Sequence, residues 1–222
     1  MRVFLIRHAE PDYAKDTLTE WGHRQAQALA DALASVRLDW LFASPMGRAQ
    51  RTANYIAHRQ NIPVKTLDWL RELNSNWEGS KWAWNGIDVA IALLKSGRLP
   101  QPQNWHECVP YGSLVSPQAQ KLARHFDETL AAFGYLRDGL LYCVMQPNDL
   151  AIAFVTHAGT ILTLLSHLFN WALPSVYSHL NCDVASITEL NWQEHDGYAI
   201  PQLLRFNDTV HWRQLTKRVV GR

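Results

Sequence analysis

Side chains that can do chemistry follow two short apolar segments of this chain. Arg7 and His8 come directly after Val3–Ile6, a run of strand-forming residues without Pro or Gly. Thr156-His157-Ala158-Gly159 follows a second such run, Ala151–Val155. In an open parallel sheet, ligands bind just beyond the carboxyl ends of the strands. The pattern therefore predicts that two imidazoles and a guanidinium meet at one edge of a sheet.

Two further segments add a second guanidinium and a carboxylate. Arg48 lies about one turn into a predicted helix that follows the strand candidate Leu38–Ala43, so its side chain can return toward the end of that strand. Glu72 follows a third strand candidate, Val64–Leu67, within Leu70-Arg71-Glu72. All of these groups can converge on the same edge of one sheet.

This set of groups suits a phosphoryl group. Arginines hold phosphate oxygens in forked, charge-assisted hydrogen bonds, and a helix N-terminus with the small residues Ala158-Gly159 offers backbone N–H donors to an anion. A neutral imidazole can attack phosphorus and form a phosphohistidine. A carboxyl group can protonate the leaving oxygen and later deprotonate the attacking water. Because the arginines and the second imidazole can spread the charge, we expect neither a metal nor a cofactor.

The elements that position these groups alternate as strand–helix–strand–helix–strand. The first helix is expected to begin near Thr17 or Thr19, and the second at Ser44-Pro45, as a cap followed by proline. This order predicts a three-layer α/β/α fold with a mostly parallel, doubly wound sheet. Two alternating runs, 184–190 and 200–205, predict an antiparallel hairpin at the sheet edge.

Residues 77–112 interrupt this alternation. They hold four of the ten tryptophans and a helix candidate near Ile87–Lys95. The stretch is too short for a core of its own, so we expect one domain over residues 1–222 with an insertion or cap at about 77–112. One hypothesis is that Trp82, Trp84 or Trp105 contributes to a cap over His8; the alternative is that these indoles only pack.

Composition excludes several classes of protein. The formal net charge of the 222 residues is +1, and no basic stripe indicates a nucleic-acid partner. The three cysteines are odd in number, far apart and without CxxC spacing: Cys108, Cys143 and Cys182. They predict neither a zinc knuckle nor a disulfide framework, and reduced thiols fit a cytoplasmic protein best. The sequence leaves a monomer and a homodimer both open.

One long apolar segment, 150–173, resembles a membrane helix in hydrophobicity. It would then carry several polar side chains, His157 and His167 among them, and polar groups are costly inside a bilayer. A buried strand at Ala151–Val155 that turns into a helix over residues 159–169 explains the segment better. We therefore expect no membrane partner.

In their order along the chain, the motifs resemble those of the histidine phosphatase superfamily, the phosphoglycerate-mutase-like fold. The matching segments are Arg7-His8-Ala9-Glu10, Leu18-Thr19-Glu20 with Gly22 and Gln25-Ala26, Ser44-Pro45 with Arg48-Ala49 and Thr52-Ala53, Leu70-Arg71-Glu72 with Trp77-Glu78-Gly79, Thr156-His157-Ala158-Gly159, and Phe206-Asn207-Asp208. Each motif is weak alone. The ordered set spans nearly the whole chain and is a strong signal.

The resemblance implies a role for each matching residue. His8 would accept the phosphoryl group, while Arg7, Arg48 and His157 would hold its oxygens. Glu72 would be the proton donor. The spacing of this motif is slightly shortened, and Glu78 is therefore the second candidate.

The chain also departs from the family pattern. Ala9 stands where the signature has Gly, and the loop Pro11–Asp16 lacks the Asn that helps many members bind phosphate. Gly112-Ser113-Leu114 lacks the usual Glu. These departures affect the outer substrate pocket more than the phosphate site.

The resemblance favours a metal-independent phosphatase that hydrolyses a small organic phosphomonoester through a phosphohistidine on His8. The first alternative is a cofactor-dependent phosphoglycerate mutase. In such mutases an Arg typically follows the catalytic Glu, whereas Leu73 follows Glu72 here, and the basic residues of 80–115 are few: Lys81, Lys95 and Arg98. The second alternative is a non-catalytic protein that binds a phosphate ligand.

Overall fold

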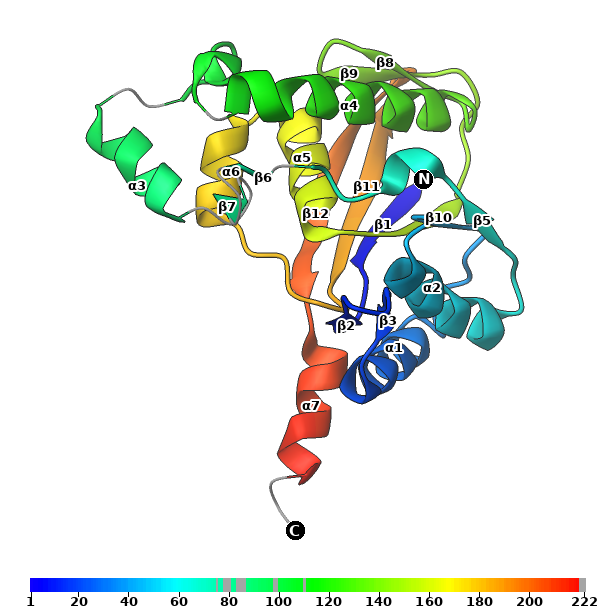
Figure 1. The fold of residues 1–222 in the computed structure, drawn as a ribbon. Helices are drawn as coiled ribbons and strands as arrows, with labels where there is room; N and C mark the ends of the chain where they lie inside the picture. Colours follow the sequence, from blue (N-terminus) through cyan, green and yellow to red (C-terminus); the bar gives the residue numbers. More distant parts are fainter. Residues whose placement is uncertain (75, 78–80, 83–86, 98–99, 110, 220–222) are drawn as a thin grey trace.

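The computed structural model describes residues 1–74, 76–77, 81–82, 87–97, 100–109 and 111–219, and Figure 1 shows its fold. The described residues form a central eight-stranded sheet with the order β5-β4-β10-β1-β11-β12-β9-β8. In that order the strands are β5 Val64–Thr66, β4 Trp40–Ala43, β10 Ala151–Thr156, β1 Arg2–Arg7, β11 Ile187–His195, β12 Tyr198–Asp208, β9 Leu141–Val144 and β8 Tyr135–Asp138. Strands β5, β4, β10 and β1 are parallel, and the pairs from β1 to β8 are antiparallel. The predicted α/β class with a parallel sheet and an antiparallel part is confirmed.

Helices cover both faces of this sheet (Figure 1). On one face are α1 Glu20–Ala32 and α2 Gly47–Gln60, and on the other are α4 Ser116–Ala131, α5 Ala158–Phe169 and α6 Leu173–His179. Helix α3 Ile87–Lys95 contacts α6, and α7 Val210–Val219 contacts α1. Short 3-10 turns span Asp68–Leu70 and Trp105–Glu107, and a π-helical turn spans Tyr111–Val115. Two small ribbons pair β2 Pro11–Asp12 with β3 Thr17–Leu18, and β6 Asn76–Trp77 with β7 Lys81–Trp82.

Strand β1 supplies side chains to two separate cores. Val3 and Leu5 pack with residues of α4, α5 and α6, while Phe4 and Ile6 pack with residues of α1 and α2. Successive residues of a strand point to opposite faces of its sheet, so an uninterrupted apolar run is what a strand covered on both sides requires. The two cores give the three layers that the sequence predicts.

The position of the C-terminal hairpin corrects one expectation. The hairpin of β11 and β12 lies inside the sheet, because β11 also pairs with β1 and β12 with β9. The sheet edge on that side is a second hairpin, β8 and β9, which the sequence analysis did not predict. The Asp138-Gly139 dipeptide is the sequence feature that indicates this turn, since Asp-Gly is common in short hairpin loops. In the structure Gly139 has φ +59°, as such a loop requires.

The start of α2 also differs from the expectation. Ser44 was expected to cap this helix, with Pro45 as its first residue, yet α2 begins at Gly47 and its N-cap is Met46. The Ser44 hydroxyl is instead 3.3 Å from the Met46 amide and 2.8 Å from His157. The N-cap of α2 therefore lies two residues later than the sequence predicts, and the Ser44 hydroxyl binds His157 instead.

Strand β10 and helix α5 account for most of the long apolar segment. All six residues of β10 and ten of the twelve residues of α5 are buried. Burial of a helix on nearly all sides explains its apolar composition. Among the helices that the structure describes, none is long and apolar enough to cross a membrane. The division into one domain with an insertion at 77–112 stays a prediction.

Candidate active site

Three strands of the parallel half end side by side, and a polar residue follows each of them. Arg7 at the end of β1 pairs with Thr156 at the end of β10, and Val155 pairs with Ala43 at the end of β4. His8, Ser44 and His157 are therefore the first residues beyond three neighbouring strands. The sequence predicted this convergence for the two histidines, and the structure brings them together.

His8 is 2% exposed, and its ring lies between a backbone carbonyl and a guanidinium. Its Nδ1 is 2.8 Å from the carbonyl oxygen of Ala9, and its Nε2 is 3.2 Å from Nε of Arg48. The carbonyl can only accept and the guanidinium can only donate. The proton is therefore on Nδ1, and the lone pair of the neutral ring is on Nε2.

His157 contacts the same guanidinium. Its Nδ1 is 3.3 Å from Nη2 of Arg48, and its Nε2 is 2.8 Å from the hydroxyl oxygen of Ser44. Because the guanidinium donates to Nδ1, the ring proton is on Nε2 and donates to Ser44. The rings of His8 and His157 have their centroids 5.0 Å apart at an interplanar angle of 64°.

Both imidazoles are neutral at neutral pH. Burial, followed by the positive charges of Arg7 and Arg48, lowers the pKa of His8 from 6.5 to about 3. Burial, together with the neighbouring His8 and Arg48, lowers the pKa of His157 well below 6.5. A neutral ring keeps the lone pair that attack on phosphorus needs, and in His8 this lone pair accepts a hydrogen bond from Arg48.

Arg7 is fixed by one bond and leaves one donor unused. One terminal nitrogen, Nη1, donates to the carbonyl oxygen of Cys182. Its Nε is buried and has no hydrogen-bond partner among the residues that the structure describes. An unpaired buried donor costs about 1–3 kcal/mol, a cost that an anion bound at this nitrogen would remove.

Glu72 lies against the first turn of α5, the helix that begins directly after His157. Its Oε1 accepts hydrogen bonds from the amides of Leu73 and Thr160, both at 3.1 Å, and its Oε2 is 3.4 Å from the amide of Gly159. Burial raises the pKa of the Glu72 carboxyl above its ordinary value, although the amides of Gly159 and Leu73 act in the opposite direction. A carboxyl with a raised pKa suits an acid that must carry a proton near neutral pH.

This contact changes the expected use of the helix N-terminus. Two first-turn amides of α5, those of Gly159 and Thr160, bind the carboxylate of Glu72. The hydroxyl of Thr160 also donates to the carbonyl oxygen of Arg71, at 2.9 Å, which fixes the acid segment to the helix. Phosphate binding by the amide of Ala158, the first residue of α5, stays a prediction. Glu78, the second candidate for the acid, lies outside the described residues.

Two side chains of this cluster were missed by the sequence analysis. Asp16 pairs with Arg48, at 2.7 Å between Oδ1 and Nη1, and Ser44 binds His157. The sequence pattern predicts a helix cap at Ser44 and a loop at Asp16. The partners of both residues lie far away in sequence, so local patterns carried no signal for these contacts.

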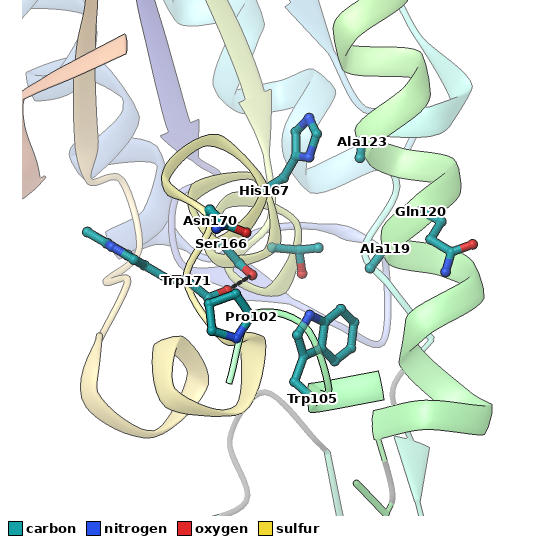
Figure 2. A pocket seen from close by; sticks show the side chains of 10 residues that line it. Pro102, Trp105, Ala119, Gln120, Ala123, Ser166, His167, Asn170 and Trp171 are labelled. Carbon is teal, nitrogen blue, oxygen red and sulfur yellow. Dashed lines mark hydrogen bonds between the residues drawn. The ribbon is translucent and has the colours of Figure 1, made fainter. Parts of the chain in front are cut away.

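A separate cavity of about 170 Å³ lies between α4 and the second half of α5 (Figure 2). Trp105, Ser166, His167 and Trp171 are among its lining residues. His167 is bound to Asp127 at 2.8 Å, and its place here separates it from the His8 cluster at the start of α5. The side chains of Trp82 and Trp84 lie outside what the structure describes, so the proposed cap over His8 stays a prediction.

Within the described part of the chain, no group of three or more His, Cys, Asp or Glu residues could hold a metal ion. The groups that meet at His8 are two imidazoles and a guanidinium, and the carboxylate of Asp16 pairs with the solvent side of that guanidinium. Such a set attracts an anion.

A buried neutral imidazole beside a guanidinium and a second imidazole, at the carboxyl edge of an α/β sheet, defines a class of phosphoryl-transfer site. Residues 3–87 match the family model of the histidine phosphatase superfamily, branch 1. The probable phosphoglycerate mutase GpmB of Yersinia enterocolitica is 35% identical over 222 residues, which cover 95% of this chain and 94% of that protein. The chain therefore belongs to the histidine phosphatase superfamily, and it is an enzyme.

Two other similar proteins carry phosphatase names. The putative phosphoserine phosphatase 2 of Hydrogenobacter thermophilus is 24% identical over 224 residues, 97% of this chain and 99% of that protein. The crystal structure of a phosphoserine phosphatase variant from Entamoeba histolytica, in complex with phosphoserine, superposes with a TM-score of 0.67 at 22% identity. That match covers 95% of this chain and 98% of the other, and it shows that the fold is shared.

Proposed function

We propose that this protein is a metal-independent phosphatase that hydrolyses a small organic phosphomonoester through a phosphohistidine on His8. The observation that carries the proposal is the state of His8: buried, neutral, and with the lone pair of Nε2 directed at Arg48. An anion drawn to that guanidinium would lie next to the nucleophilic nitrogen. Positioning of this kind supplies much of the rate in phosphoryl transfer.

The first half-reaction transfers the phosphoryl group to His8. The Nε2 lone pair forms a bond to phosphorus while the bond between phosphorus and the ester oxygen breaks. Glu72 gives its proton to that oxygen, and the alcohol leaves. Arg7 and Arg48 donate charge-assisted hydrogen bonds to the phosphoryl oxygens. His157 can add one from Nε2–H when that proton turns from the Ser44 hydroxyl to a phosphoryl oxygen.

The second half-reaction restores the enzyme. Glu72, now a carboxylate, takes a proton from water as the water oxygen bonds to phosphorus. The bond between phosphorus and Nε2 breaks, inorganic phosphate leaves, and His8 returns to the neutral ring. Glu72 returns to its protonated form, so no net proton is gained or lost by the protein.

A phosphoglycerate mutase is the second candidate, because one similar protein, 35% identical, carries that name. Against it, Leu73 follows Glu72, and residues 80–115 offer only three basic side chains for a carboxylated substrate. The substrates named for similar proteins are carboxylated: phosphoserine and 3-phosphoglycerate both occur in complexes with structural neighbours. Esters of this size are the first class to screen here.

The test is a comparison of hydrolysis with isomerisation on the same enzyme. Phosphate release from phosphoserine, 3-phosphoglycerate and p-nitrophenyl phosphate is measured with and without EDTA, along with formation of 2-phosphoglycerate. We expect phosphate release that EDTA leaves unchanged. Rapid isomerisation of 3-phosphoglycerate with little phosphate release would favour the mutase, and neither activity would favour a binding protein.

A further inference from the structure

The loop between β2 and β3 contacts the cluster through one carboxylate, that of Asp16. Its Oδ1 is 2.7 Å from Nη1 of Arg48, and its Oδ2 is 2.6 Å from the backbone amide of Gly47. Both donors belong to the first turn of α2, since this helix begins at Gly47. One carboxylate thus connects the Arg48 guanidinium to the N-terminus of the helix that carries it.

Asp16 also supplies a cap that α2 otherwise lacks. The N-cap residue, Met46, makes no side-chain capping bond. A carboxylate at a helix N-terminus is favoured both by the unpaired amides and by the helix dipole. The approach requires a glycine, because a Cβ added at Gly47 would lie 2.0 Å from the backbone oxygen of Asp16. The loop and the helix are therefore matched in shape as well as in charge.

The remaining nitrogens of Arg48 face the two histidines. Its Nε donates to His8, and its Nη2 donates to His157 and to the sulfur of Met46, while Nη1 donates to Asp16. The side chain of Arg48 is 8% exposed, and that of Asp16 is 47% exposed. Asp16 therefore lies on the solvent side of the guanidinium, and the imidazoles lie on its buried side.

Tyr13 contacts the same guanidinium from this loop. Its ring centroid is 5.4 Å from the guanidinium carbon of Arg48, and the residue is 67% exposed. Arg48 is thus held from outside by a ring face and a carboxylate. Because the guanidinium is planar and its donors form a rigid fork, fixing one nitrogen fixes the direction of the other two.

We infer that Asp16 is a positioning residue: it holds Arg48 so that Nε and Nη2 are directed at the phosphoryl position between His8 and His157. This inference rests on the proposed function, because it takes Arg48 as a ligand of the phosphoryl group. Asp16 touches neither His8 nor the reacting atoms in this arrangement and acts through Arg48. Removing its carboxylate leaves the guanidinium charged but without its ion-pair partner, so its orientation is less well fixed. We therefore expect weaker phosphate binding, even though a negative charge near the site is lost.

The test compares Asp16→Ala and Asp16→Asn with a control from the same loop, Asp12→Ala. The carboxylate of Asp12 accepts from the amides of Ala14, at 3.1 Å, and Lys15, at 3.4 Å. Asp12→Ala therefore perturbs the loop without removing a bond to Arg48. For each protein, kcat and KM are measured with p-nitrophenyl phosphate, together with the inhibition constant of inorganic phosphate and the thermal midpoint.

We expect Asp16→Ala to raise KM and the phosphate inhibition constant together by about 10-fold, the scale of a lost charge-assisted hydrogen bond. The Asn variant, whose amide oxygen still accepts one bond, should recover part of this loss. Asp12→Ala should leave both constants within about two-fold at a similar thermal midpoint.

Three results would overturn the inference. Tighter phosphate binding by Asp16→Ala would show a carboxylate that competes with the substrate. An equal rise of KM and of the phosphate inhibition constant in Asp16→Ala and Asp12→Ala would mean that Asp16 only orders the loop. If both constants are unchanged in Asp16→Ala, Asp16 does not position Arg48. In each of these cases the wild-type enzyme is active. A wild-type protein that neither hydrolyses the ester nor binds phosphate would instead refute the proposed function, and the inference with it.

Discussion

Ser44 and His157 are joined by a hydrogen bond of 2.8 Å between the serine hydroxyl oxygen and Nε2 of the imidazole. Both residues are fully buried, and each is the first residue beyond its strand. The guanidinium of Arg48 can only donate to Nδ1 of His157, so the ring proton is on Nε2 and the Ser44 hydroxyl oxygen accepts it. Ser44 thus fixes the orientation of the second histidine.

Ser44→Ala should lower kcat/KM by about 10-fold, because His157 loses the partner that fixes the orientation of its ring. The matched control is Ser166→Ala, which also removes a buried hydroxyl, one that donates to the carbonyl of Trp171 beside the separate cavity. Each variant should cost about 1 kcal/mol of unfolding free energy. Steady-state kinetics and urea unfolding of both proteins check this. Equal activity of the two variants would remove the role of Ser44.

His8→Ala should lower kcat by at least about 10³-fold, because the variant has no nitrogen to accept the phosphoryl group. Wild-type enzyme quenched during turnover of a ³²P-labelled ester should carry label on His8 that is stable in alkali and labile in acid. His167→Ala is the control, since this imidazole binds Asp127 beside the separate cavity. Label that persists in the His8 variant would move the nucleophile to another residue.

Much of the site could be predicted from sequence because the groups follow strands. Once Val3–Ile6 and Ala151–Val155 are taken as neighbouring parallel strands, the residues that follow them must meet, whatever lies between. The register confirms this, since Arg7 pairs with Thr156. The strand ends are therefore the part of the site that a linear pattern can place.

The contacts that the sequence did not predict are those between a strand end and a distant loop or helix. Ser44 followed by Pro45 has the composition of a helix cap, and only its distance from His157 shows another role. Asp16 caps α2 from 31 positions earlier in the chain. The order of the antiparallel strands was missed for a similar reason, since alternation indicates a strand but does not choose its neighbours.

Glu72→Gln should slow hydrolysis of alkyl phosphates by about 100-fold, the usual scale for the loss of a general acid. Hydrolysis of p-nitrophenyl phosphate should slow much less, because nitrophenolate leaves without a proton. The amide of Gln can still accept from Thr160, so the start of α5 should stay in place. Rates for a series of leaving groups, plotted against the pKa of the alcohol, give the measurement. Equal slowing across the series would assign the acid elsewhere, with Glu78 as the next candidate.

The two buried histidines should make the fold sensitive to mild acid. The pKa of His8 is about 3 in the folded protein, against an ordinary value of 6.5. Between these values the unfolded chain binds the proton and the folded protein does not, so the free energy of unfolding falls as pH is lowered from about 6.5 toward 3. Within this window His8 contributes about 1.4 kcal/mol per pH unit, and the lowered pKa of His157 acts in the same direction.

Urea unfolding at pH 7 and pH 5 tests this for His8→Asn and the wild-type protein. Asn does not titrate, so the loss of stability between pH 7 and pH 5 should be smaller in the variant by about 2 kcal/mol. His211 serves as the control: burial lowers its pKa too, but it lies outside the cluster, bonded to the carbonyl of Ala185. Its Asn variant should change the acid sensitivity less. A His8 variant with the same loss as the wild type would show that the pKa of His8 is not lowered in the folded protein.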